Sequence, residues 1–192
     1  MISHQFSCIF IHIPKCAGTS IENVLGHFDN FSGRGGQDHR TIRMIEEPII
    51  NPYICASKEN CLELLRRIRY QYRREPNPHN KLKVTKEQYR NYFKFAFVRN
   101  PWARAYSWYK NVIGDEKHRQ GYRITEGTSF NEFLRRFAGR GMLKPQTYWI
   151  TGFNGSIPLD YIGRFESLKK DFEEICRYLR ITPLVLPHKG AP

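Results

Sequence analysis

The chain has 192 residues, of which 40% are hydrophobic and 14% are aromatic. This composition excludes an intrinsically disordered chain, and the length predicts a single domain, residues 1–192, with its own hydrophobic core. The formal net charge of +13 predicts an anionic partner, which charge alone leaves open among a nucleotide, an acidic glycan, nucleic acid and an acidic lipid.

No stretch approaches the roughly 20 apolar residues that span a bilayer, and the N-terminus lacks the pattern of a signal peptide. We therefore expect no membrane span in this chain. The five cysteines are scattered, with no C-x-x-C pair that would indicate a zinc or redox site. This usage is typical of reduced thiols, so the expected location is cytoplasmic.

The first half of the chain alternates short apolar runs with helical patterns. Residues 8–13 are apolar and β-branched, which predicts a buried strand. Residues 19–28 have the apolar spacing of a helix, with Thr19 or Ser20 as its cap. After a Gly-rich loop at residues 30–39, the expected elements are a short helix at 40–47, a strand at 52–57, an amphipathic helix at 58–74 and a short helix at 86–92.

The second half repeats this alternation. The expected elements are a strand at 93–98, a helix at 100–112 with Pro101 in its first turn, a helix at 128–139, a strand at 159–165 and an amphipathic helix at 167–181. Strands that alternate with helices predict an α/β fold in which helices cover both faces of a central parallel sheet.

The segment "PKCAGTS", residues 14–20, connects the first expected strand to the first expected helix. In a parallel α/β sheet, such a loop presents backbone N–H groups to an anion. Lys15 supplies a positive charge, and Gly18 permits close approach of the backbone. The loop differs from the ATP-binding pattern G-x-x-x-x-G-K-[ST], because Lys15 precedes the glycine. Taken alone, the segment is also compatible with a simple turn that carries a solvated lysine.

A second segment, "RNPWARAYSWY" at residues 99–109, follows the strand at 93–98. Arg99, Arg104 and Ser107 recur at about one-turn intervals, and arginine matches a phosphate group with paired donors. These residues predict an anion clasp, although each one alone is compatible with an ordinary surface position.

Together the two segments resemble the sulfotransferases that use 3′-phosphoadenosine 5′-phosphosulfate as donor. In that family a "PK-x-[AG]-[GS]-T-[ST]" loop holds the 5′-phosphosulfate and "RNP-x-x-R-x-x-S-x-Y" holds the 3′-phosphate. The later segment "LDYIGRFESLKKDFEEIC" is similar to the carbohydrate-acting branch, which includes heparan and chondroitin sulfotransferases and small bacterial relatives. The resemblance implies a P-loop-like three-layer αβα fold and 3′-phosphoadenosine 5′-phosphosulfate as co-substrate. No metal is expected, because no cluster of carboxylates accompanies the loop in the sequence.

The resemblance also implies roles for individual residues. The loop residues that would hold the 5′-phosphosulfate are Lys15, Cys16, Ala17, Gly18, Thr19 and Ser20. Arg99 and Ser107 would hold the 3′-phosphate, and Arg164 would be a further anion contact. Relatives usually continue beyond the point where this chain ends, so the C-terminus is expected to be truncated or that of a minimal member.

The reaction needs a base for the acceptor hydroxyl and a cation at the leaving oxygen. His39, in "GQDHRTI", is favoured as the base because a similar histidine before a short helix, of the "H-x-[ST]" kind, is the base in several members of the family that the chain resembles, and because imidazole titrates near neutral pH. Lys15 is favoured for the leaving charge. His188 and Glu166 are the rival bases. His12 lies inside the first strand and is expected to be a core residue.

The expected acceptor is a hydroxyl-bearing molecule such as an acidic glycan. The basic segment 66–94 either lines its groove or is a solvated face, and no nucleic-acid-binding motif accompanies the charge, so no nucleic acid is expected. Two other functions stay open, a non-catalytic module that binds a nucleotide or polyanion and, with less support, a P-loop kinase.

Overall fold

The computed structural model describes residues 1–47, 57–182 and 184–187. Its central sheet has the strand order β1-β2-β3-β4. The strands are β1 (Ile2–Ser3), β2 (Cys8–Ile11), β3 (Phe93–Val98) and β4 (Tyr161–Arg164). Strands β2, β3 and β4 are parallel, whereas β1 pairs antiparallel with β2. The predicted α/β class is confirmed, with one antiparallel edge strand that the sequence analysis did not predict.

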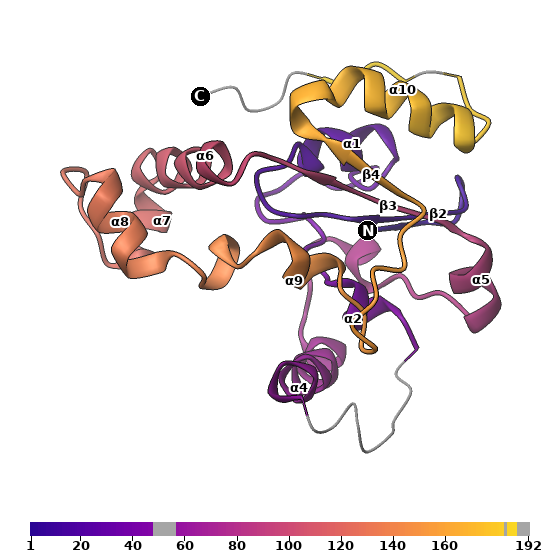
Figure 1. Cartoon of the computed structure of the whole chain (residues 1–192), viewed down its shortest axis with the longest axis horizontal. Coiled ribbons are helices and arrows are strands. Elements are labelled where there is room, and N and C mark those ends of the chain that lie inside the picture. Colours follow the sequence, from indigo (N-terminus) through magenta and orange to yellow (C-terminus); the bar gives the residue numbers. More distant parts are fainter. Residues whose placement is uncertain (48–56, 183, 188–192) are drawn as a thin grey trace.

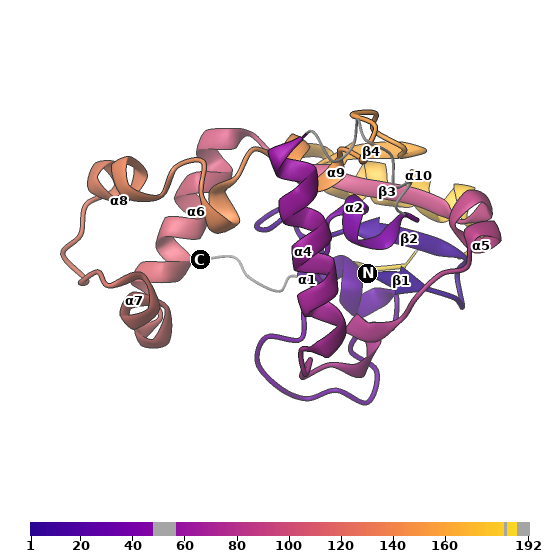
Figure 2. The ribbon, with the colours of Figure 1, turned by 90° about the horizontal axis from the view of Figure 1, so that it is seen from below.

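Helices cover both faces of the sheet (Figures 1 and 2). Helices α1 (Gly18–Val24) and α10 (Leu168–Tyr178) lie on one face, and α2 (Ile42–Ile45) and α9 (Gln146–Ile150) lie on the other. Helix α4 (Lys58–Tyr72) lies beyond α2, at the bottom of Figure 1. The predicted three-layer arrangement is therefore confirmed.

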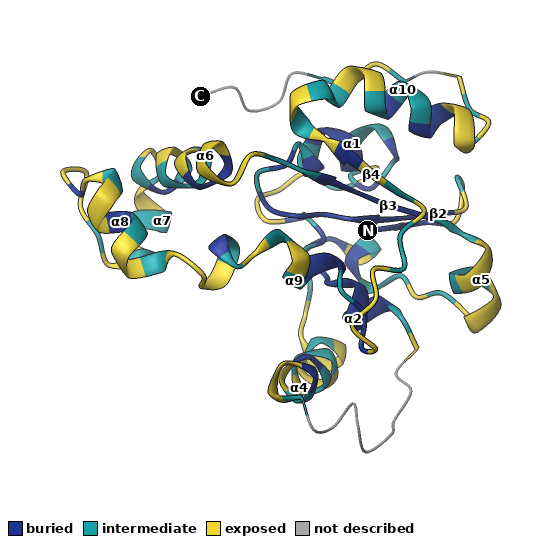
Figure 3. Cartoon of the chain, in the orientation of Figure 1, coloured by how far each residue is buried: buried dark blue, intermediate teal, exposed yellow. Residues whose placement is uncertain are grey.

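The sheet is the centre of the main hydrophobic core (Figure 3). All four residues of β2 are buried, and Phe95 and Phe97 of β3 are fully buried against them. On α10, Phe172 and Ile175 face the sheet as the sequence pattern predicted. Strands β2, β3 and β4, next to which the predicted donor-binding residues lie, therefore belong to a closely packed core.

Three helices, α6 (Pro101–Ile113), α7 (Glu116–Tyr122) and α8 (Phe130–Phe137), project to one side of the sheet (Figures 1 and 2). A second, smaller apolar cluster around Val112 and Phe133 holds them together. The remaining helical elements are α5 (Lys86–Asn91) and the 3₁₀ turns η1 (Pro78–Lys81), η2 (Gly141–Leu143) and η3 (Phe165–Ser167). In the described part of the chain, no helix is both long and apolar enough to cross a membrane.

Two of the expected elements are the strand at residues 52–57 and the helix at residues 58–74. The strand predicted at residues 52–57 lies, apart from Ser57, outside the described residues. The helix predicted at 58–74 is present, but it buries Asn60 and Glu63. Its apolar side chains are about half exposed or more, at Leu62, Leu65, Ile68 and Tyr72. Spacing thus predicted the helix, while buried polar contacts decide which side faces the protein.

Candidate active site

The loop between β2 and α1 reverses direction through two residues in the left-handed region, Lys15 (φ 65°) and Ala17 (φ 63°). Ala17 is the N-cap and makes no side-chain cap, so the prediction that Thr19 or Ser20 caps this helix is wrong. A Cβ atom at Gly18 would lie 1.9 Å from Cδ2 of His12. Glycine is therefore required at position 18 because the backbone packs directly on the buried His12 ring.

The side chains of this loop point in different directions. Lys15 Nζ donates a hydrogen bond of 3.2 Å to Asn111 Oδ1 on α6. Burial, and next the charge of Arg99, lower the pKa of Lys15. Cys16 is buried with its Sγ near the Pro14 carbonyl, and burial raises the pKa of this thiol to about 12. An anion in the loop would therefore meet Lys15 and not a thiolate.

The side chains of Thr19 and Ser20 also point in different directions. Thr19 lines the pocket described below, whereas the Ser20 hydroxyl donates to the carbonyl of Pro187 at 3.0 Å. Gly18 and Thr19 begin α1, and N–H groups in the first turn of a helix have no partner within the helix. The structure thus leaves backbone donors and the Thr19 side chain at this end of the loop, while the Ser20 side chain is already occupied.

Arg99, immediately after β3, lies against the same loop. Its Nη1 donates to the Lys15 carbonyl at 3.2 Å, and its guanidinium lies 3.9 Å from the centre of the Phe165 ring. Gln146 holds the Arg99 backbone through hydrogen bonds to its N–H and C=O groups. The Nε of Arg99 is one of the buried nitrogens that have no hydrogen-bond partner in the described residues. Arg99 therefore keeps hydrogen-bonding capacity beside the loop.

Arg104, by contrast, is committed to the protein itself. It is 4% exposed, and its Nε donates to the Pro14 carbonyl at 3.0 Å. Its other nitrogens donate to the carbonyls of Lys144 and Met142. The expectation that Arg104 belongs to the anion clasp is wrong, since its guanidinium donates to three backbone carbonyls, of which that of Pro14 belongs to the loop. Ser107, on the next turn of α6, is half-buried.

A pocket of about 700 Å³ brings several of the predicted residues together. Lys15 and Thr19 form one side of it and His39 another. Further lining comes from α4 and from the α6–α7 region, namely Arg66, Arg69, Tyr70, Arg73, Trp108, Asn111 and His118. Arg99, Ser107 and Arg164 are not among its lining residues. The pocket therefore joins the loop lysine to the predicted base, with a basic helix as its wall.

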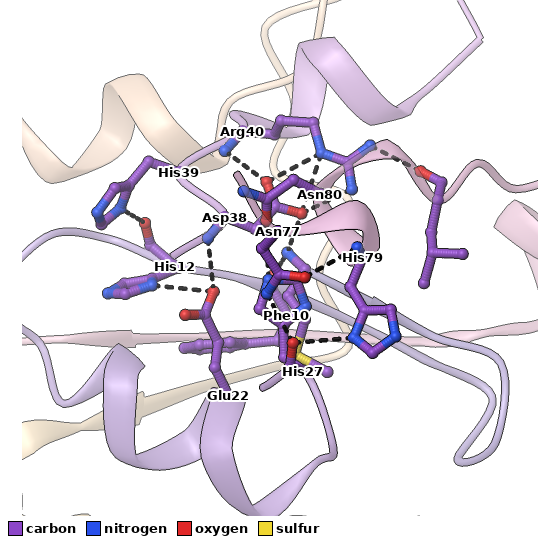
Figure 4. Close-up of polar contacts among 12 residues, drawn as sticks. Phe10, His12, Glu22, His27, Asp38, His39, Arg40, Asn77, His79 and Asn80 are labelled. Carbon is purple, nitrogen blue, oxygen red and sulfur yellow. Dashed lines mark hydrogen bonds and ion pairs between the residues drawn. The ribbon is translucent and has the colours of Figure 1, made fainter. Parts of the chain in front are cut away.

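His39 is half-buried and is held by backbone contact (Figure 4). Its Nδ1 lies 3.3 Å from the carbonyl oxygen of His12. Because a carbonyl only accepts, this Nδ1 carries the proton and Nε2 is the unprotonated nitrogen. Burial, and next the neighbouring His12, lower the pKa of His39 to about 3. His39 is thus a neutral ring at physiological pH, with Nε2 able to accept a proton.

The model of the sulfotransferase family matches residues 1–191. The chain belongs to the sulfotransferase family. Carbohydrate sulfotransferase 14 of Mus musculus is 24% identical over 209 residues, which cover 96% of this chain and 47% of that protein. The Homo sapiens protein of the same name is 23% identical over the same shares. The Danio rerio protein is 31% identical over 43% of this chain and 28% of its own length.

The chain spans about half the length of the curated mouse and human relatives that it matches. No solved structure matches it. The family match covers both predicted anion-binding segments and the strand β4 segment.

Within this sulfotransferase domain, the rival bases have other positions. Glu166 is exposed, and its Oε1 accepts the N–H of Asn100 at 2.7 Å. This backbone hydrogen bond is the main cause that lowers the pKa of Glu166. Asn100 in turn caps α6, so Glu166 holds the start of the helix that carries Ser107. His188 lies outside the described residues.

Arg164 ends β4 beside Val98 of β3, close in the sheet to Arg99. Its side chain is exposed, and its N–H donates to Asp171 Oδ2 at 2.7 Å. Within the described ranges, no group of three or more His, Cys, Asp or Glu side chains could hold a metal ion.

Asn111 and His118 are among the residues of the pocket wall that the sequence did not predict. Asn111 contacts Lys15, and its Nδ2 also lies 3.1 Å from His118 Nδ1. Asn111 follows Ser107 by four residues, so the shared helix face was a signal that could have placed it near the donor. His118 lies on α7, a polar seven-residue helix without a clear apolar period, and no sequence signal identified it.

Proposed function

We propose that this protein transfers a sulfuryl group from 3′-phosphoadenosine 5′-phosphosulfate to a hydroxyl group of a carbohydrate. The observation that carries the proposal is the single pocket lined by Lys15, Thr19 and His39. Family membership and the curated carbohydrate sulfotransferases among the relatives support the reaction class and the acceptor class.

The residues of the loop fit a phosphosulfate. Lys15 and the first-turn N–H groups of α1 are donors at the end of a parallel strand, where anions bind in such folds. Arg99, with its unpartnered Nε, lies directly behind Lys15 and is proposed to extend this site toward the 3′-phosphate together with Ser107. Donor binding would draw Lys15 away from Asn111, because the phosphosulfate offers it a charged partner.

In the proposed reaction, the acceptor oxygen forms a bond to sulfur while the bond between sulfur and the 5′-phosphate oxygen breaks. Nε2 of His39 takes the hydroxyl proton, and Lys15 stabilises the negative charge that develops on the leaving phosphate. A transfer with a loose transition state asks mainly for positioning and charge stabilisation, which a preformed pocket supplies.

An acidic glycan suits the remaining wall. Arg66 and Arg69 of α4 line the same pocket, as do Tyr70 and, directly after the helix, Arg73. Of the basic segment at residues 66–94, these residues support the groove interpretation, because they face the site instead of bulk solvent alone. We propose that they bind carboxylate or sulfate groups of the acceptor while its hydroxyl lies at His39.

The test is acceptor-dependent release of 3′-phosphoadenosine 5′-phosphate from the donor, measured across a panel of glycans and small alcohols. His39→Ala should abolish release and still bind the spent nucleotide, whereas His4→Ala, an exposed histidine bonded to Tyr92, should behave as the parent does. Nucleotide binding without turnover on any acceptor would favour the binding-module hypothesis. Tight magnesium-dependent ATP binding would favour a kinase, and a turning-over His39→Ala protein would remove His39 as the base.

A further inference from the structure

Glu22 is a fully buried carboxylate on the inner side of α1 that the proposed reaction does not use. Its Oε1 lies 3.0 Å from Nδ1 of His12 and also accepts the backbone N–H of Asp38 at 3.0 Å. Figure 4 shows these contacts converging on one oxygen, from His12 directly after β2 and from Asp38 in the segment that precedes α2. One side chain therefore connects the end of β2 to the residue next to His39.

His12 contacts both Glu22 and His39, the proposed base. Its ring centre lies 4.2 Å from that of His39, and its carbonyl oxygen faces His39 Nδ1. The same ring also packs on Gly18 of the loop at residues 14–20. Any movement of the His12 ring would thus disturb both the donor loop and the contact that sets the His39 tautomer.

The two buried carboxylates near His39, Glu22 and Asp38, differ in the partner with which each is paired. Asp38 is the other buried carboxylate here, but Arg40 binds it with Nε at 2.9 Å from Oδ1 and Nη2 at 2.6 Å from Oδ2. Although burial would raise the pKa of Asp38, Arg40 holds it below its usual range. Glu22 is paired with an imidazole instead, whose pKa burial lowers to about 3, so its negative charge is not cancelled in this way.

The titratable groups that face Glu22 are His12 directly after β2, His27 after α1, Asp38 and His39 on the following segment, and the amino group of Met1. Burial raises the pKa of Glu22 to about 7, so the carboxylate is ionised in mildly alkaline solution. The groups that face His39 are His12, Glu22 and Asp38. A base with so low a pKa holds a transferred proton poorly unless an anion stabilises the imidazolium.

We propose that Glu22 is the positioning residue of the base, because its buried carboxylate both fixes the segment that carries His39 and supplies the charge against which His39 holds a proton. The inference rests on the proposed function, in which Nε2 of His39 receives the acceptor proton. It assigns no contact between Glu22 and the substrate. Its two parts, geometry and charge, are separable by substitution.

Glu22→Gln tests the charge, since glutamine keeps the volume and an oxygen that can accept the Asp38 N–H. At pH 8, kcat should fall at least about tenfold while the affinity for 3′-phosphoadenosine 5′-phosphate stays within twofold. The acid limb of the rate profile should move to lower pH. The urea midpoint at pH 8 should not fall, because the substitution removes a buried ionised group. A purely structural role predicts lost stability together with lost activity.

A matched control is Glu63→Gln on α4, which alters another buried carboxylate, bonded to the Thr41 hydroxyl at 2.7 Å. Its kcat should stay close to that of the parent. Unchanged kcat and acid limb in Glu22→Gln, or an equal loss in Glu63→Gln, would overturn the charge assignment.

A second measurement does not depend on turnover. With ¹⁵N-labelled histidine at neutral pH, His39 of the parent should be mostly protonated at Nδ1, its signal being assigned with His39→Asn. This fraction should fall in Glu22→Ala, which frees the Asp38 N–H, and should change little in Glu22→Gln or in Glu63→Gln. An unchanged fraction in Glu22→Ala overturns the positioning assignment. An inactive parent with the expected tautomer shift would instead count against the proposed function alone.

Discussion

Replacing Gly18 with alanine should break the contact between His12 and the loop at residues 14–20, which connects β2 to α1. The added Cβ would lie 1.9, 2.0 and 2.4 Å from three atoms of the His12 ring, and real Cβ atoms do not approach heavy atoms closer than 3.0 Å. The ring must therefore shift by more than 1 Å. It is 3% exposed and is confined on the sides of His39 and Glu22, so a shift would disturb one of these contacts or move the ring into the pocket that His12 lines.

Such overpacking of a buried site, with loss of the Glu22 contact, should lower the free energy of unfolding by about 2–4 kcal/mol. For a chain of this size, that corresponds to a fall in Tm of roughly 5–15 °C. Urea and thermal unfolding followed by circular dichroism would measure both. The control is Gly121→Ala in α7, where no atom lies within 4 Å of the new Cβ, and its expected change is a gain of roughly 0.5–1 kcal/mol.

A double-mutant cycle identifies the cause. In His12→Ala/Gly18→Ala the space left by the ring accommodates the new methyl group, so the double mutant should be more stable than additivity predicts by at least about 1 kcal/mol. Additive losses, or a cost of less than about 0.5 kcal/mol for Gly18→Ala alone, would refute the packing explanation. Glycine at position 18 would then be explained by approach to the ligand, as the sequence suggested.

The other predictions concern Arg104, the arginines that line the pocket, and the dependence of stability on pH. Arg104→Met should destabilise the protein by about 3 kcal/mol in urea unfolding, because three backbone carbonyls lose a charged donor; a loss within 0.5 kcal/mol would contradict the supporting role. Arg69→Ala and Arg73→Ala should raise KM for an acidic glycan severalfold, and less at high salt, without changing nucleotide affinity; equal effects on a neutral alcohol would argue against an anion subsite. The lowered pKa values of His12 and His39 mean that stability present above about pH 6.5 is lost toward pH 3, by up to about 1.4 kcal/mol per pH unit for each ring. His39→Asn should make that slope shallower, and an unchanged slope would show that His39 does not titrate in this way.

The sequence predicted those parts of the fold that local pattern determines. The strands at β2 and β3, the helices α6 and α10 and the two anion-binding segments all lie where apolar period and motif placed them. The prediction from sequence failed where contacts between residues distant in the chain decide which side of an element is buried. The apolar residues of α4 face outward because Glu63 and Asn60 find buried partners in Thr41 and in the Phe153 carbonyl.

The short helices α7 and α9 were also missed, since neither carries an apolar period long enough to distinguish it from a loop. Within the site, motif spacing brought Lys15 and His39 into one proposal, and the structure places them in one pocket. It did not distinguish Arg104, which donates to three backbone carbonyls, from Arg99, which keeps unused hydrogen-bonding capacity beside the loop. Both residues have the same chemistry in sequence, and only the carbonyls around Arg104 separate their roles.

His12 shows why a core position can still determine function. The sequence predicted a core residue inside a strand, and the structure confirms the burial, with contacts to Phe10 and His39, but β2 ends one residue earlier, at Ile11. Yet its ring is the surface on which Gly18 packs, and its carbonyl sets which nitrogen of His39 is free. Because Glu22 holds that ring from the side of α1, the donor loop and the proposed base form one packed unit, and a change in either should be felt at the other.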